Sequence, residues 1–251
     1  MIMAPIRILY KTILLVLLLI MGGILAFLFL RNTMPTQGPA ATMTRLWHRA
    51  SLFILGIKLH VHGDRQNGNV LFVPNHISWL DISILGTLIP THFLSKAEIL
   101  YWPVIGMLAS RTGTLYIQRG SRDASARSNE VMRHALEQQH NIVLFAEGTT
   151  TDGSMRKFHG RLMQSAIDAE GQVQPVALFY PDESGHALNR KVLYIDEMHF
   201  LKSVFTILAS PSIPAEVHFL EPIEAKDKSR DELARHCHDS IYKIIKRERI
   251  N

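Results

Sequence analysis

Short apolar runs with strand character alternate with helical stretches along most of this chain, and this alternation narrows the possible folds more than any other feature. Strands that alternate with helices are typical of α/β domains, whose sheets are largely parallel. We therefore expect an α/β fold, a largely parallel mixed sheet flanked by helices, over residues 58–251. The expected strands are residues 58–62, 70–73, 91–95, 114–118, 141–145, 173–180, 192–195 and 216–219, and the expected helices are residues 79–88, 102–110, 124–139, 161–168 and 231–250.

The first 57 residues follow a different pattern, which predicts a membrane anchor. Residues 13–30 are uncharged and almost wholly apolar, with Arg7 and Lys11 before them and Arg31 after them. The length of this run is at the short end for a membrane-spanning helix and is large for the core of a signal peptide. We expect an uncleaved N-terminal helix or helical hairpin, and the basic residues on both sides leave its orientation open.

A linker and a second amphipathic segment complete this N-terminal region. Residues 32–44 hold two prolines and a glycine, and are expected to form a linker. Residues 45–57 repeat apolar side chains at helical spacing, with basic side chains on the other side. This pattern predicts either a helix on the membrane interface, with Trp47 near the headgroups, or the first helix of the soluble domain.

Composition excludes several classes of site. A single cysteine, Cys237, cannot form an internal disulfide or a thiolate metal cluster. Lys and Arg outnumber Asp and Glu by 27 to 22, an excess that suits an anionic membrane surface or a phosphate-bearing ligand, and no nucleic-acid-binding motif accompanies it. The thirteen histidines include His60, His62, His236 and His238, but they show no HExxH or Cys/His ligand spacing. We therefore expect no metal site and no nucleic-acid partner.

The first polar motif lies where an expected strand ends. The apolar run breaks at Pro74, Asn75 and His76 follow, and a segment with helical spacing begins at Ser78. On one continuous helix His76 and Asp81 would lie about 140° apart. If Ser78 is instead the N-cap of the helix, the carboxylate of Asp81 reaches back toward the loop that carries His76. The motif predicts an imidazole oriented by a carboxylate, although the same residues also fit a capping box without catalysis.

Two further polar motifs follow expected strands. The second, GTLYIQR at residues 113–119, delivers Arg119 after a strand, and the third, FAEGT at residues 145–149, places Glu147 directly after another. Ligands of open α/β sheets gather beyond the carboxyl ends of the strands. An arginine followed by glycine and serine can grip a phosphate or carboxylate, and a Glu-Gly-Thr turn offers a carboxylate, a flexible backbone and hydroxyls. The three motifs are therefore expected to share one site.

These motifs together resemble the glycerolipid acyltransferases, typified by bacterial 1-acylglycerol-3-phosphate acyltransferase. Residues 75–81, NHISWLD, are similar to the family's NHxSxxD block, and residues 113–119 are similar to GxxFIxR, with Tyr116 in place of the usual Phe. Residues 145–149 are similar to FPEGT, and residues 173–176 are similar to an apolar block around a proline. The resemblance covers about residues 58–220 and agrees with an N-terminal anchor.

The resemblance implies a mechanism and a set of site residues. His76 would act as general base on the acceptor hydroxyl, and Asp81 would hold its tautomer. The acceptor oxygen would attack the thioester of acyl-ACP or acyl-CoA directly, so that no acyl-enzyme, metal or bound cofactor is needed. Pro175 would support the core. The residues implied in substrate binding are Asn75, Ser78, Gly113, Tyr116, Arg119, Glu147, Gly148 and Thr149.

The implied partners are a lysolipid acceptor, an acyl carrier protein or CoA thioester donor, and membrane lipids. Because these thioesters are cytoplasmic, the catalytic domain is expected to face the cytoplasm at the bacterial inner membrane.

Three departures from the family pattern bear on the acceptor. Thr150 stands where members acting on lysophosphatidate usually carry Arg, Ala146 replaces the proline of FPEGT, and His159 follows Phe158 where many members have Lys. Loss of a guanidinium at an anion site is not a neutral change. The EGTTTDG pattern at residues 147–153 resembles the branch that contains lyso-ornithine lipid acyltransferases, so lyso-ornithine lipid is the favoured acceptor and lysophosphatidate the alternative.

Two functions from other classes remain open at this point. A hydrolase could use Ser78 as nucleophile with His76 and Asp81, but Ser78 lies in no GxSxG elbow. A non-catalytic lipid-binding protein could use the same His-Asp pair only to cap a helix.

Overall fold

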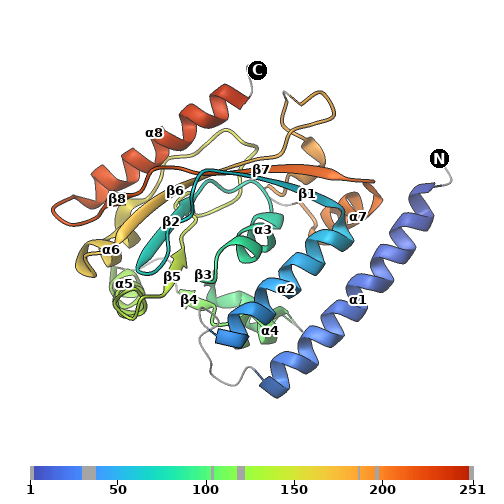
Figure 1. Cartoon of the computed structure of the whole chain (residues 1–251), viewed down its shortest axis with the longest axis horizontal. Helices are drawn as coiled ribbons and strands as arrows, with labels where there is room; N and C mark the ends of the chain where they lie inside the picture. Colours follow the sequence, from blue (N-terminus) through green and yellow to red (C-terminus); the bar gives the residue numbers. More distant parts are fainter. Residues whose placement is uncertain are drawn as a thin grey trace.

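The computed structural model describes residues 3–29, 38–102, 105–117, 122–185, 187–195 and 198–248. Within these residues eight strands form one sheet in the order β1-β7-β6-β2-β5-β3-β4, and β8 also pairs with β6 (Figure 1). All neighbouring pairs are parallel except β6 with β7 and β6 with β8. The strands are β1 (Ile57–His62), β2 (Val70–Pro74), β3 (Thr91–Lys96), β4 (Leu115–Ile117), β5 (Asn141–Val143), β6 (Gln172–Phe179), β7 (Ile213–Phe219) and β8 (Ile223–Glu224). The predicted largely parallel mixed sheet is confirmed.

Helices cover both faces of the sheet and enclose two hydrophobic cores (Figure 1). The strand β2 shows why there are two, because its side chains alternate: Val70 and Phe72 enter one core, and Leu71 and Val73 enter the other. A strand buried on both faces reads as a continuous apolar run, as β2 does. The helices are α1 (Met3–Phe29), α2 (Gly38–Leu55), α3 (Leu80–Leu88), α4 (Ile105–Arg111), α5 (Arg122–Glu137), α6 (Gln164–Asp168), α7 (Phe200–Ala209) and α8 (Arg230–Glu248), with the 3-10 turns η1 (Ala97–Tyr101), η2 (Gly160–Met163) and η3 (Arg190–Val192).

The helix α1 is long and apolar enough to cross a membrane by length and composition, yet polar groups fasten it to the rest of the chain. Lys11 is 2% exposed, and its Nζ donates to the carbonyls of Leu55 and Ser210, each at 2.8 Å. Trp47 donates from Nε1 to the carbonyl of Leu18 at 3.2 Å. The last carbonyls of a helix have no partner inside it, so Lys11 satisfies groups at the ends of α2 and α7.

The opposite side of α1 remains apolar and exposed. Ile6, Leu9, Leu17 and Phe27 are each more than half exposed. The same helix therefore presents one side to its own protein and a continuous apolar side outward, which suits contact with lipid.

The helix α2 combines the two roles that the sequence left open. Leu52 and Leu55 belong to the core, whereas Phe53 is 85% exposed. The division of the chain at residue 57 stays a prediction, since these core residues precede it.

The structure corrects several predicted elements. Residues 38–44, expected in a linker, are helical, and α2 begins at Gly38. Of residues 192–195, expected as a strand, Val192 ends η3 and the other three follow it. The Tyr194 N–H donates to the Ile77 carbonyl, and the Tyr194 carbonyl accepts from Thr150, instead of pairing in the sheet. The helix α7 was not predicted, although its apolar residues have helical spacing. Ser78, the expected N-cap of α3, lies one residue too early, because Trp79 occupies that position.

Buried His48 predicts how stability depends on pH. It lies on α2 against Gly86 of α3, where an added Cβ would come within 2.5 Å of the His48 ring. Burial lowers the pKa of His48 to about 4 from 6.5, so the unfolded chain takes up a proton in this window and the folded chain does not. We expect the free energy of unfolding to fall by about 3 kcal/mol from this residue as the pH drops from 6.5 to 4.

Urea unfolding in detergent at several pH values measures this effect. His48→Met should remove that part of the pH dependence while other histidines keep theirs. Parallel pH curves for the two proteins would contradict the prediction.

Candidate active site

The loop after β2 is built so that the chain can leave the sheet without losing sheet hydrogen bonds. Asn75 follows Pro74 and is 1% exposed. Its Nδ2 donates to the carbonyl of Leu178 at 3.0 Å, and its Oδ1 accepts from the Leu178 N–H at 2.7 Å. The side chain thus takes the place of the next strand residue against β6, and the backbone turns toward α3.

That turn brings His76 and Asp81 together. His76 Nδ1 lies 2.8 Å from Asp81 Oδ2, which also accepts from the backbone N–H groups of Ile77 at 2.8 Å and Ser78 at 3.0 Å. Asp81 is fully buried, and His76 keeps 15% of its side chain exposed. One carboxylate oxygen therefore both closes the turn and orients the imidazole.

Tyr180, directly after β6, completes the surroundings of Asp81. It is fully buried, and its hydroxyl donates to Asp81 Oδ1. Burial, together with the neighbouring carboxylate, raises the pKa of Tyr180 well above its usual value, so the phenol remains a donor. An ionised carboxylate can only accept hydrogen bonds, and the Asp81 carboxylate faces four donors. Because Asp81 accepts from His76 Nδ1, the ring proton is on Nδ1 and the lone pair is on Nε2.

The third motif packs directly on His76. The rings of His76 and Phe145 are stacked, with centroids 3.8 Å apart. Glu147 is 3% exposed, and its two oxygens accept from the backbone N–H groups of His76 at 2.7 Å and Arg156 at 2.9 Å. Burial raises the pKa of Glu147, and these two donors act in the opposite direction. Thr151 donates from its N–H and hydroxyl to the His76 carbonyl. Glu147 thus holds the N–H of His76 and Thr151 holds its carbonyl, while Phe145 packs on the ring.

A cleft of about 1850 Å³ opens beside the imidazole. His76, Glu147, Gly148 and Thr149 line it on one side. The cleft continues between helices that contribute mainly apolar side chains, and these are Leu18 and Gly22 of α1, Trp47 of α2, and Phe200, Leu201 and Val204 of α7. The arrangement suits a molecule with a reactive polar group and a long apolar chain.

Two residues predicted to bind substrate have structural contacts. Asn75 uses both amide groups on Leu178, and Ser78 is fully buried with its Oγ accepting from Leu80 N–H at 3.4 Å. They lie beneath the turn and are not among the residues that line the cleft, and their role in substrate binding stays a prediction. This burial also argues against Ser78 as a hydrolase nucleophile, because a buried hydroxyl cannot reach a substrate.

The second motif reaches the cleft through Thr114, whereas two of its predicted substrate-binding residues have contacts within the protein. Gly113 accepts from His92 Nδ1 at 2.6 Å through its carbonyl, and Tyr116 donates to the carbonyl of Gly106 at 3.2 Å. Both positions brace α4 and β3, and the cleft is lined instead by their neighbours Thr112 and Thr114. Arg119 lies outside the residues that the structure describes.

Comparisons with known proteins identify the family. A model of the acyltransferase family matches residues 58–179. The chain is 37% identical over 244 residues to a lyso-ornithine lipid O-acyltransferase of Pseudomonas aeruginosa, a match that covers 95% of this chain and 93% of that protein. The chain belongs to the acyltransferase family. The resemblance found in the motifs is thereby confirmed.

Two further acyltransferases are informative. A 1-acyl-sn-glycerol-3-phosphate acyltransferase of Neisseria gonorrhoeae is 36% identical over 132 residues, 52% of each protein. The crystal structure of PlsC from Thermotoga maritima, a 1-acyl-sn-glycerophosphate acyltransferase, has a TM-score of 0.68 and 17% identity, and the match covers 98% of this chain and 96% of that one. This last similarity shows that the chain has the fold of that structure over nearly its whole length.

Sequence reasoning assigned no role to Tyr180, Phe145 or Thr151 in this acyltransferase site. Phe145 is the first residue of the third motif and Thr151 belongs to the EGTTTDG pattern, but their contacts with His76 cannot be read from the motif letters. Tyr180 is 99 residues from Asp81 in the chain. Its position at the end of an expected strand, where parallel strands place their ligands, was the available signal.

Tyr180→Phe tests the hydroxyl that holds Asp81. The ring stays, but the carboxylate loses one donor, and a hydrogen bond to a charged group contributes about 1.5–3 kcal/mol. We expect kcat for acyl transfer to fall about 10- to 100-fold with little change in KM. Steady-state kinetics measure this, with Tyr242→Phe on the exposed face of α8 as control. Unchanged kcat would show that Asp81 is held without Tyr180.

Glu147→Gln tests the carboxylate that joins the two loops. Glutamine has one oxygen, so its amide nitrogen would face a backbone N–H that then has no acceptor. We expect the free energy of unfolding to fall by about 1–3 kcal/mol, together with a loss of activity. Urea unfolding measures the change, and Glu221→Gln at an exposed position is the matched control. Equal stability of the two variants would contradict the structural role of Glu147.

Proposed function

We propose that this protein is a membrane-bound O-acyltransferase that moves a fatty acyl group from acyl-ACP or acyl-CoA to the free hydroxyl of a lysolipid. Lyso-ornithine lipid is the favoured acceptor. The observation that carries this proposal is the His76 imidazole, bound through Nδ1 to buried Asp81 and placed on the wall of a cleft that continues between apolar helices.

The chemistry follows from this geometry. His76 Nε2 takes the proton of the acceptor hydroxyl as its oxygen attacks the thioester carbonyl. Asp81 keeps the imidazole in the required tautomer and stabilises the imidazolium that forms. The tetrahedral intermediate then breaks the carbon–sulfur bond, and the departing thiolate receives the proton. The acyl group passes directly to the acceptor, so burial of Ser78 is compatible with the reaction.

Two observations favour an acceptor other than lysophosphatidate. Thr150 stands where a guanidinium would contact phosphate, and its hydroxyl donates to the Tyr194 carbonyl. The charged lining of the cleft also has both signs, with Lys157, Arg161 and Arg230 beside Glu98 and Asp231. A headgroup that carries both an amine and a carboxylate fits such a lining better than a phosphate dianion does.

The cleft and the apolar surface together support a membrane location. The outer side of α1, Phe53 of α2, and Leu201 and Phe205 of α7 form exposed apolar surface on the elements that line the cleft. An acceptor that enters from the bilayer keeps its chain out of water, which would otherwise cost about 0.8 kcal/mol for each CH₂. Because thioester donors are cytoplasmic, we place this surface on the cytoplasmic leaflet of a bacterial inner membrane.

A second candidate activity is 1-acyl-sn-glycerol-3-phosphate acylation. It is favoured by the 36% identity to the Neisseria gonorrhoeae protein of that name, over 52% of each chain. The match to the Pseudomonas aeruginosa protein extends over nearly the whole of both chains, and we therefore rank the ornithine lipid first.

A paired acceptor assay separates these activities. Purified protein in detergent receives a labelled acyl-ACP or acyl-CoA, with lyso-ornithine lipid and lysophosphatidate offered in parallel. We expect labelled ornithine lipid, and His76→Ala should lower kcat about 10²- to 10⁴-fold, the range of general acid–base catalysis. His236→Ala, at an exposed position of α8, should leave the rate unchanged.

The other results would decide against parts of this proposal. Phosphatidate as the main product would assign the protein to the second activity. An undiminished rate in His76→Ala would remove the general base, and binding of both acyl donor and lysolipid without product would indicate a lipid-binding protein.

A further inference from the structure

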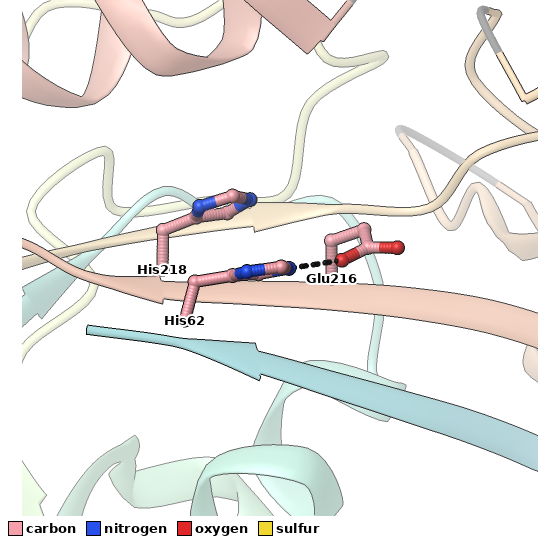
Figure 2. Close-up of side chains that lie close together, drawn as sticks. All are labelled: His62, Glu216 and His218. Atoms are coloured by element: carbon pink, nitrogen blue, oxygen red, sulfur yellow. Dashed lines mark hydrogen bonds and ion pairs between the residues drawn. The ribbon is translucent and has the colours of Figure 1, made fainter. Parts of the chain in front are cut away.

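Three potential metal ligands meet on the face of the sheet, far from the catalytic loop. Among the described residues, His62 of β1 and Glu216 and His218 of β7 form the group in which each offers one ligand atom and these atoms all lie within 4.8 Å of one another. Figure 2 shows both imidazole rings extending along the strands toward the Glu216 carboxylate. His62 Nε2 lies 2.7 Å from Glu216 Oε2.

Strand pairing explains how the three side chains come together. The parallel register of β1 and β7 places His62 opposite His218 and His60 opposite Glu216. Side chains two residues apart share one face of a strand, so Glu216 and His218 point the same way as His62. The two rings are stacked, with centroids 4.4 Å apart and planes at 14°.

A buried nitrogen of His218 also points to a bound ion. Its Nε2 is inaccessible to solvent and has no hydrogen-bond partner among the described residues. The nearest opposite charge is Glu248 Oε1 of α8, at 3.9 Å, which is beyond hydrogen-bond length. A buried polar atom without a partner is rare in native proteins and points to an ion or water bound there.

The chemistry of these ligands fits a divalent transition metal. Two imidazoles and one carboxylate form a known zinc ligand set, and Zn–N distances of about 2.0–2.1 Å place the ligands of a tetrahedral site about 3.3 Å apart. His62 Nε2 and Glu216 Oε2 lie 2.7 Å apart, and the ligand atoms of all three residues lie within 4.8 Å of one another, so side-chain rotations can bring them to this separation. A water molecule can complete a tetrahedral site with three protein ligands.

We propose that His62, Glu216 and His218 bind one Zn²⁺ ion, with a water molecule as fourth ligand. The ion joins the edge strand β1, which follows helix α2, to β7. β7 runs antiparallel to β6, and β6 runs parallel to β2, so the carboxyl ends of β1 and β7 lie at the opposite edge of the sheet from His76. The site is therefore separate from the catalytic loop and does not depend on the proposed acyl transfer.

Sequence spacing could not reveal this site. The ligands of known zinc motifs lie within a few residues of each other in pairs, whereas His62 is 154 residues from Glu216. Only the pairing of β1 with β7 brings them together.

Zinc titration of the full-length protein tests the proposal. The protein, without a polyhistidine tag, is stripped with a chelator in detergent and titrated with Zn²⁺ by calorimetry against a competing chelator. We expect one equivalent to bind and to raise the melting temperature. His62→Ala, His218→Ala and Glu216→Gln should each weaken binding by at least about 10-fold, since even residues behind the ligands contribute that much.

Matched controls make the result decisive. His60→Ala changes an exposed histidine two residues from His62 on the same face of β1, and it should bind Zn²⁺ as tightly as the unchanged protein. Glu216→Gln keeps the shape of the side chain, so its loss of affinity reports on the carboxylate and not on folding. Wild-type affinity in the three ligand variants, equal weakening in His60→Ala, or no binding to the unchanged protein at micromolar Zn²⁺ would overturn the proposal.

Discussion

The carboxylate of Asp81 is the interaction on which the active-site region depends. A fully buried carboxylate is costly unless donors surround it, and Asp81 accepts from His76, Ile77, Ser78 and Tyr180. These donors come from the turn after β2 and from the end of β6. The same hydrogen bonds that make burial of the charge tolerable therefore fix the turn, join two strands of the sheet and orient the imidazole.

Around this carboxylate, the other side chains of the site act mainly through the backbone. Asn75 extends the β2–β6 pairing by one residue, and Glu147 and Thr151 bind the main chain of His76. At Pro175 the strand β6 lacks an N–H, and its carbonyl accepts from the Leu220 N–H at 3.0 Å where the pairing changes from β8 to β7. Rigid strand ends thus hold a small number of reactive atoms at the wall of an adaptable apolar cleft.

The side of the molecule that carries α1, α2 and α7 differs from the side that carries His62, Glu216 and His218. Helices α1, α2 and α7 offer apolar surface and line the cleft that reaches the imidazole. The other face carries the cluster of His62, Glu216 and His218, where β1 would otherwise be an edge strand held by β7 alone among the described strands. This edge strand directly follows α2, on which Phe53 is 85% exposed.

The sequence by itself determined the α/β class, most strand positions and the His76–Asp81 pairing, because each depends on contacts within a few residues. Period-two and helical patterns are local, and a turn between β2 and α3 can be read from Pro74 and the spacing of the polar residues. Tertiary structure alone decided that Tyr180 donates to Asp81, that Ser78 and Asn75 are buried beneath the loop, and that residues 192–195 bind the catalytic loop instead of forming a strand. These features depend on which strands become neighbours and in what register, and that choice is made by packing between segments about a hundred residues apart.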